Sequence, residues 1–202
     1  MNSTIYTSPR RRGFTLVEMI GVLAVIAVLA GLLVPRVFSA IAQSRINTAA
    51  LGYNSLKSAS LLYFGKYGRF GGAAGAPTNA VAAWDSSVLL TEGFVEKKFE
   101  TQMATATEVD LVAASANVAV TAAAAGTYDI AGITGNNTAI GVSVVEAVLT
   151  GVSADDAKEL NDRIDGAALG LTTGTTADIK GRVKYDIATG TTGTVRLYIA
   201  HK

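Results

Sequence analysis

The sequence predicts an α+β protein, in which a long kinked helix near the N-terminus, over about residues 14–64, is followed by an antiparallel β-sheet head. Three observations predict this arrangement. The run 14–34 is apolar apart from one charge, and apolar and small residues continue at helical spacing beyond Pro35. Near the C-terminus, two segments alternate apolar and polar residues with the period of a strand.

The first element is the apolar run 14–34, in which Glu18 is the only charged residue. As a helix this run reaches about 31 Å, which is the thickness of the hydrocarbon core of a bilayer. Three arginines, Arg10 to Arg12, precede it. Because basic residues that flank a membrane span stay on the cytoplasmic side, we expect an N-in, C-out orientation.

Glu18 is unusual in this position, because a carboxylate inside hydrocarbon costs on the order of a few kcal/mol and usually meets a partner. No basic residue lies in the run itself. If a peptidase cut after Gly13, the new α-amino group of Phe14 would lie one helical turn from Glu18. The amine of a neighbouring copy could then pair with this carboxylate, so that the charge becomes a polymerisation contact.

The segment from Gly13 to Glu18, with the sequence GFTLVE, resembles the N-terminus of type IV pilins and of the pseudopilins of type II secretion systems. Pro35 also matches a helix-kinking proline of many family members. The resemblance covers about 25 of the 202 residues. It implies that a prepilin peptidase cleaves between Gly13 and Phe14 and methylates the new N-terminus to N-methyl-Phe14, and that Phe14, Glu18 and Pro35 serve assembly.

The resemblance also implies a pilin-like domain organisation. Residues 1–13 would be a cleaved prepilin leader, 14–35 the transmembrane and filament-core helix, and 36–70 its amphipathic continuation. Residues 71–202 would form a globular β-rich head, with its antiparallel sheet packed on the C-terminal half of the helix.

Three other interpretations of the N-terminal stretch compete. An ordinary secretory signal could use Ala40 to Ala42 as its small-residue cleavage site, but Glu18 and Arg36 fit poorly. A twin-arginine export signal is likewise disfavoured by Glu18. A plain membrane anchor does not require Gly13, Phe14 and Glu18 together.

Composition limits the classes of function. The chain has room for the helix and one modest head, rather than for two enzyme domains. From Phe14 onward it carries 14 basic and 16 acidic residues, a net charge of −2, so bulk charge gives no case for DNA as a direct ligand. It contains no cysteine, so the loop that many pilins close with a disulfide cannot be closed that way here.

The helix is expected to continue beyond Pro35 for roughly 50 residues in all, with a kink near the proline, because proline removes a backbone hydrogen bond. Apolar and small residues form one stripe of this amphipathic continuation: Val37, Ile41, Ser44, Thr48, Leu51, Ser55, Ala59 and Leu62. Glycines between 65 and 72 favour a helix end there.

Four aromatic residues lie at this predicted helix end: Tyr63, Phe64, Tyr67 and Phe70. We expect them to pack the head onto the helix, because aromatic side chains at a helix end are more often core than exposed platform. The alternative is a stacking surface for single-stranded nucleic acid, which Lys66 and Arg69 would support.

Further elements of the head are less distinct. Residues 84–93 favour a short helix, and β-favouring pieces lie at 117–120, 127–130 and 140–149. Four carboxylates invite comparison with the calcium-binding loop of major pseudopilins: Asp85, Glu92, Glu96 and Glu100. Because they lack the alternating spacing of a calcium loop, a calcium ion in the head is chemically possible but not supported, and no cofactor is expected.

A second helix is expected from Ser153, whose hydroxyl can cap the free amides, while Asp155 and Asp156 favour the positive helix end. Its buried stripe is predicted at Ala157, Leu160 and Ile164. Capping explains the two adjacent carboxylates better than acid–base catalysis does.

Residues 182–188 and 194–200 predict an antiparallel hairpin with one face on the core, joined by 189–193. In the first strand the residues assigned to the core face are Val183, Tyr185 and Ile187, and those that alternate with them are Lys184 and Asp186.

The sequence predicts no enzyme. The only histidine is His201, next to the last residue, so neither a Cys/His or Ser/His nucleophile nor a two-histidine metal motif can be built. The stretch from Gly132 to Gly135 lacks the lysine and hydroxyl residue that complete a phosphate-binding loop.

The resemblance therefore implies a structural subunit of a type IV pilus-like filament, a homo-oligomer that polymerises through its hydrophobic N-terminal helix. Its partners would be the inner membrane before assembly, the prepilin peptidase, and pilus or secretion machinery. Its destination would be an extracellular pilus or a periplasmic pseudopilus. Two alternatives stay open: a pseudopilin of a type II secretion system or DNA-uptake pseudopilus, and a membrane-anchored ligand-binding module.

Overall fold

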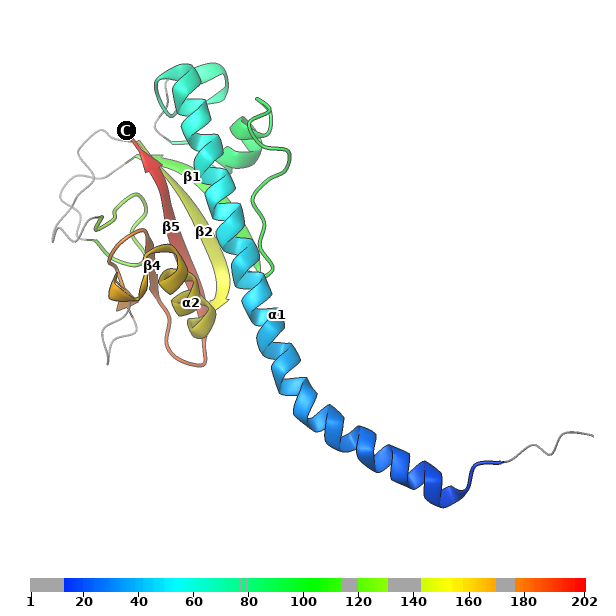
Figure 1. The fold of residues 1–202 in the computed structure, drawn as a ribbon. Coiled ribbons are helices and arrows are strands. Elements are labelled where there is room, and N and C mark those ends of the chain that lie inside the picture. Colours follow the sequence, from blue (N-terminus) through cyan, green and yellow to red (C-terminus); the bar gives the residue numbers. More distant parts are fainter. Residues whose placement is uncertain (1–12, 77, 79, 114–119, 131–142, 170–176) are drawn as a thin grey trace, which may run out of the picture. The chain divides into compact units, whose positions relative to one another are not determined.

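The structure, a computed structural model, describes residues 13–76, 78, 80–113, 120–130, 143–169 and 177–202. The chain forms two compact units, Met1–Ile41 and Ala42–Lys202. Figure 1 shows their helices and strands. Helix α1 belongs to both units, and all other helices and strands of the described residues lie in the second.

Helix α1, Leu16–Tyr67, is one helix of 52 residues, which confirms the long helix predicted from the sequence. Pro35 lies inside it, and the hydroxyl of Ser39 donates to the Pro35 carbonyl at 3.1 Å. The kink at Pro35 stays a prediction.

The C-terminal end of α1 lies where its glycines predict. Gly68 adopts φ of 69°, a conformation that favours glycine, and its N–H donates to the Phe64 carbonyl at 2.7 Å. Beyond it, a single 3₁₀ turn, η1, covers Ala73–Gly75.

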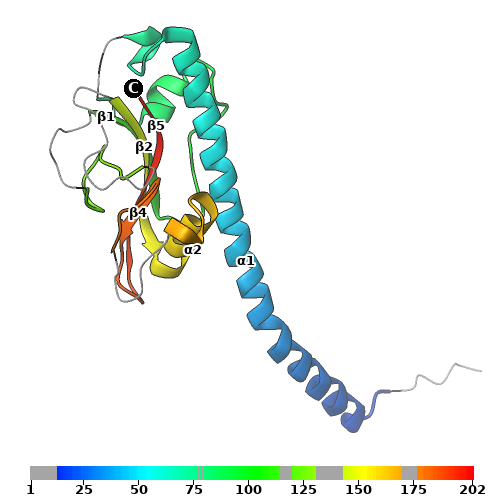
Figure 2. The same ribbon diagram turned by 60° about the vertical axis from the view of Figure 1, so that its left-hand side comes forward.

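The second unit contains a five-stranded antiparallel sheet with the strand order β1-β2-β5-β4-β3. The strands are β1 (Ala106–Ala113), β2 (Ser143–Ser153), β3 (Ala177–Asp178), β4 (Val183–Asp186) and β5 (Thr192–His201). Figure 2 shows β2 and β5 beside the C-terminal half of α1, which gives the α+β, pilin-like layout that the sequence predicts.

The predicted hairpin is confirmed as β4 and β5, with Val183 opposite Leu197. The predicted piece 140–149 is confirmed from Ser143 onward. Residues 117–119, 132–135 and 140–142 lie outside the described residues.

The strand expected at 127–130 is wrong, because this segment makes only one isolated bridge, from Asp129 to Lys180. Its backbone is held by a side chain instead, since Lys184 Nζ donates to the Thr127 carbonyl at 2.7 Å. Strand β1 was not predicted, although Val109 and Leu111 face the core and Asp110 between them does not.

The core of the second unit lies between α1 and one face of the sheet. The buried residues of α1 are Ile46, Ala49, Tyr53, Leu56, Ala59, Ser60 and Tyr63. This face differs from the predicted stripe, of which only Ala59 is buried between Ser44 and Leu62. The tyrosines determine which face of α1 packs against the sheet, because their rings bury more area than serine or threonine side chains and their hydroxyls reach backbone carbonyls. Tyr53 donates to Tyr198 O at 2.8 Å.

The aromatic residues at the helix end belong largely to the core, as predicted. Tyr63 and Phe70 are buried and meet the ring of Trp84 edge-on, with centroid distances of 5.1 and 6.0 Å. Phe64 and Tyr67 are half-buried against the same core. Their packing favours the structural interpretation over a stacking surface for nucleic acid.

The short helix expected at 84–93 is one π-helical turn, η2, Asp85–Leu89, followed by a turn in which Gly93 has φ of 77°. Buried Asp85 accepts from Phe99 N–H at 2.7 Å, which ties the following loop to η2.

Helix α2, Ala154–Ile164, confirms the predicted cap, since Ser153 Oγ accepts from Asp156 N–H at 3.2 Å. Ala157 and Leu160 are buried, and Ile164 packs against the core half-buried. A 3₁₀ turn, η3, follows at Ala167–Leu169.

Glu92 links three parts of the head. Its carboxylate accepts hydrogen bonds from the Tyr67 hydroxyl and the Ala74 N–H, and it pairs with Lys66 at 3.3 Å. The hydrogen bond from Tyr67, followed by that from Ala74, lowers the pKa of Glu92 below its ordinary value of 4.5. The ionised form therefore holds the end of α1 to η1.

This link predicts a pH dependence of stability. Because its pKa is lowered on folding, Glu92 stabilises the head above its ordinary pKa, and this contribution is lost as the pH falls through the lowered value. We expect Glu92→Gln to lower the unfolding midpoint at pH 7 and the difference from wild type to shrink in acid. Fluorescence of Trp84, the single tryptophan, reports the transition. A difference that grows in acid would contradict this role.

The face of the sheet that points away from α1, here called the outer face, is also covered. The hairpin prediction had placed only one face of the sheet on the core. Lys184 is fully buried there. Its Nζ donates to the carbonyls of Ala124 and Thr127 and lies 4.5 Å from the centroid of the Tyr128 ring. Burial lowers the pKa of Lys184 to about 8.

Glu146 lies on β2, which is separated from β4 by β5, and it is also fully buried. Its carboxylate accepts from the Tyr128 hydroxyl at 2.7 Å and from Gly126 N–H at 3.0 Å, and it pairs with Arg196 at 2.5 Å. Lys184 and Glu146 together fasten residues 124–128 to the outer face.

Candidate processing and assembly site

Gly13 and Phe14 lie just before α1, outside any helix or strand, and both are exposed. A Cβ at Gly13 would meet no atom within 4 Å, so folding of the described chain does not require glycine at this position. Arg10 to Arg12 lie outside the described residues. The exposed pair offers a peptidase an accessible peptide bond.

Thr15 and Glu18 form a reciprocal cap at the start of α1. Thr15 Oγ1 accepts from Glu18 N–H at 3.2 Å, while Glu18 Oε2 accepts from Thr15 N–H at 2.9 Å. Thr15 Oγ1 also lies 2.9 Å from the same carboxylate oxygen, as a donor. This is the capping box, in which a hydroxyl residue and a glutamate three positions later satisfy each other's backbone N–H.

The sequence argument missed this role of Glu18, although the spacing Thr15-x-x-Glu18 just before an apolar run is its signature. The cap gives Glu18 partners within its own chain at the positive end of the helix dipole. Only Oε2 accepts in the hydrogen bonds between these two residues, and the Glu18 side chain is exposed.

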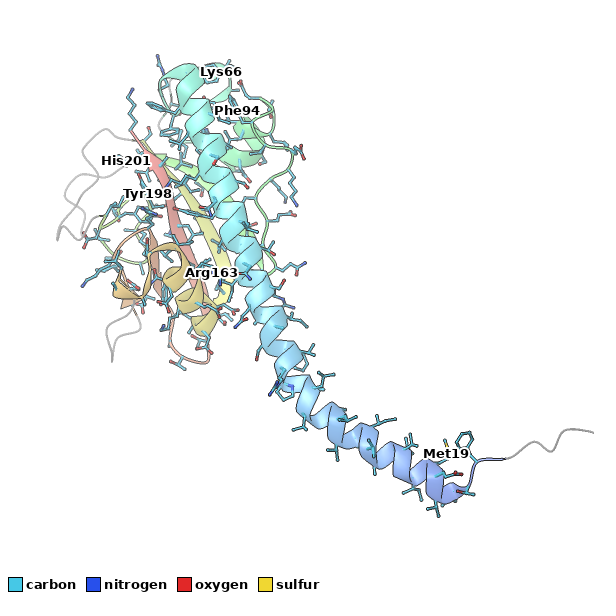
Figure 3. The ribbon with its side chains drawn as sticks, viewed as in Figure 1. Met19, Lys66, Phe94, Arg163, Tyr198 and His201 are labelled. Carbon is cyan, nitrogen blue, oxygen red and sulfur yellow. The ribbon has the colours of Figure 1, made fainter. Side chains whose placement is uncertain are left out.

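The remainder of the first unit is an uncovered apolar helix. Every residue from 13 to 41 is exposed, and the large apolar side chains stand away from the helix, as Met19 does in Figure 3. By length and composition, α1 is the one helix of the described residues that could cross a membrane. Because so much apolar surface is unfavourable in water, this helix needs lipid or other helices around it.

Three of the four carboxylates considered for calcium make separate contacts. Asp85 accepts a hydrogen bond from Phe99 N–H, and Glu92 accepts one from the Tyr67 hydroxyl. Glu100 forms an ion pair with Lys98 at 2.9 Å. In the part of the chain that the structure describes, no three His, Asp or Glu side chains gather as a metal site.

The fold and the N-terminal site define a class of protein: an exposed apolar helix, capped by a glutamate and preceded by an accessible glycine, that continues into an antiparallel-sheet head. Residues 8–34 match the family model described as the prokaryotic N-terminal methylation motif, the signature of prepilin-type proteins. This motif supports a type IV pilin- or pseudopilin-like protein, and the proteins that carry it are generally structural and non-enzymatic. No curated protein and no solved structure matches it.

Proposed function

We propose that the chain is a structural subunit of a type IV pilus-like filament. It inserts with its N-terminus in the cytoplasm, is cleaved between Gly13 and Phe14, and receives a methyl group on the new amine. Assembly machinery then extracts it, and its apolar helix stacks inside a helical filament. The observation that carries the proposal is the fully exposed apolar helix of the first unit, headed by Gly13, Phe14 and Glu18.

Two forces would hold such a filament. Burial of the apolar side chains of 14–34 against sister helices replaces lipid contacts and supplies cohesion. The Phe14 amine of a neighbour pairs with Glu18, which sets the register between subunits. The capping box supports this role, because it fixes the carboxylate at the first turn, close to its own chain start.

Shearing of cells and electron microscopy test the proposal. A surface pilus gives abundant sheared fibres that contain this chain. A secretion or DNA-uptake pseudopilus gives few fibres, and deletion of the gene then abolishes export of secreted enzymes or uptake of DNA. A chain that stays monomeric in detergent while its head binds a ligand would instead identify a membrane-anchored binding module.

Processing makes a separate prediction. We expect Gly13→Ala or Gly13→Val to block cleavage, because the peptidase needs glycine before the scissile bond, whereas the fold has open space for a side chain there. Gly21→Ala is the matched control, since Gly21 also has open space but lies inside α1. Intact mass spectrometry gives the readout. Detection of N-methyl-Phe14 in the Gly13 variants would contradict the assigned cleavage site.

A further inference from the structure

A groove of about 390 Å³ lies between α1 and the C-terminal end of β5, within the second unit. Its apolar lining includes Leu61, Phe64 and Tyr198, and its cationic or basic side chains are Lys57, Arg182 and His201. Leu61 is 54% exposed, so the apolar surface is open to a partner. Figure 3 shows Tyr198 and His201 together at this end of the strand.

The charge of the groove is one-sided. None of the described residues that line it is acidic. Neither Lys57 nor Arg182 takes part in an ion pair of the described residues, although Arg182 interacts electrostatically with Asp165 and with the Tyr53 hydroxyl. A partner that brings carboxylates to this groove would meet these cations beside apolar side chains, which favours both attraction and orientation.

The opposite end of the same strands carries such carboxylates. In the β2–β5 pairing, Val144 is opposite His201 and Ser153 is opposite Thr192. The groove and the first turn of α2 thus lie at opposite ends of this ladder, which spans about 30 Å. Figure 1 shows α2 at the end of β2 away from the C-terminus.

The first two turns of α2 present Asp155, which is exposed, and Asp156 and Glu159, which are partly exposed. Lys158 lies among them, but its Nζ forms an ion pair with Asp162 Oδ2 at 2.6 Å. No ion pair of the described residues involves the three carboxylates. This end of the head is therefore acidic where the groove end is basic.

We propose that the groove between α1 and β5 receives the acidic first turns of α2 from a second copy of the chain. The inference rests on the proposed filament function and names the contact between successive heads. Because the two complementary patches lie at opposite ends of one head, each copy offers a groove to one neighbour and an α2 to another. Such a head-to-tail contact does not close on itself unless the rotation forms a ring, and it suits an open filament.

Introduced cysteines test the contact directly, because the natural chain has none. Lys57→Cys combined with Glu159→Cys in the full chain, treated in cells with a short bis-maleimide, is expected to give a ladder of multimers. Each single variant gives no ladder. Lys97→Cys with Glu159→Cys is the matched control, because Lys97 is exposed but lies outside the groove.

Charge reversal gives an independent readout. Lys57→Glu with Arg182→Glu is expected to lower the yield of sheared filaments about tenfold or more, since like charges then face each other. Asp155→Lys with Glu159→Lys is expected to restore the yield in the same chain. Arg69→Glu with Lys97→Glu, two exposed cations outside the groove, should leave it unchanged.

The outcomes separate the two proposals. Normal filaments from the Lys57→Glu, Arg182→Glu chain, or filaments without the cysteine ladder, overturn the groove contact and leave the filament function standing. If the natural chain is correctly processed but forms no filaments, and the Lys57→Cys, Glu159→Cys chain gives no ladder, both the filament function and this contact are overturned.

Discussion

Glu18→Val is expected to enter the membrane normally and to yield no filaments. Insertion is unaffected or improved, because the substitution removes the only carboxylate of the apolar run, whose burial in hydrocarbon costs on the order of a few kcal/mol. Assembly fails because the subunit loses the acceptor for a neighbour's Phe14 amine. It also loses the oxygen that holds Thr15 N–H at 2.9 Å.

Two further variants separate the capping role of Glu18 from its charge. Glu18→Gln keeps an oxygen that can accept from Thr15 N–H but carries no charge. Thr15→Ala removes the capping hydroxyl and keeps the carboxylate, which costs about 1 kcal/mol of local helix stability. If charge pairing between subunits sets the register, Glu18→Gln behaves like Glu18→Val, and Thr15→Ala assembles at reduced yield.

Membrane fractionation measures insertion, intact mass measures processing, and shearing with electron microscopy measures assembly. Met19→Leu, a conservative change in the same exposed helix, is the control and should assemble normally. Normal filament yield from Glu18→Gln would eliminate the charge pairing. Normal yield from Glu18→Val would eliminate any assembly role of this residue.

The N-terminal methylation motif was predictable from the sequence, because its signals are local. An apolar run, one carboxylate and a preceding glycine can be recognised without knowledge of what they contact. The capping box is equally local, and the spacing of Thr15 and Glu18 would have shown it. The end of α1 at Gly68 and the cap at Ser153 were predicted for the same reason, since turn and cap chemistry depends on neighbouring residues.

The head was less predictable where distant segments decide the outcome. The stripe through Leu51 and Ser55 has helical spacing, yet α1 turns Tyr53 and Leu56 to the sheet, because those side chains bury more apolar area. Lys184 follows the alternation of an outward-facing residue, but residues 124–128 cover it. Local alternation gives the two faces of a strand and does not tell whether a remote segment packs on the second.

The second large effect is expected at Glu146, the buried carboxylate on the outer face of the sheet. Glu146→Leu removes the partner of Arg196 and the acceptor of the Tyr128 hydroxyl, while both remain in place. Because breaking a buried ion pair leaves an uncompensated charge, we expect a loss of about 3–5 kcal/mol in the free energy of unfolding.

Urea unfolding of the full chain in detergent, followed by Trp84 fluorescence, measures this loss, since Trp84 is the single tryptophan and is fully buried in the core of the head. Glu108→Leu on β1 is the matched control, because Glu108 is exposed, and it should change the free energy little. Limited proteolysis should cut residues 120–130 faster in Glu146→Leu than in the control. Equal stability and equal cleavage of the two variants would show that Glu146 does not hold this segment, and would leave Lys184 as the group that fastens it to the sheet.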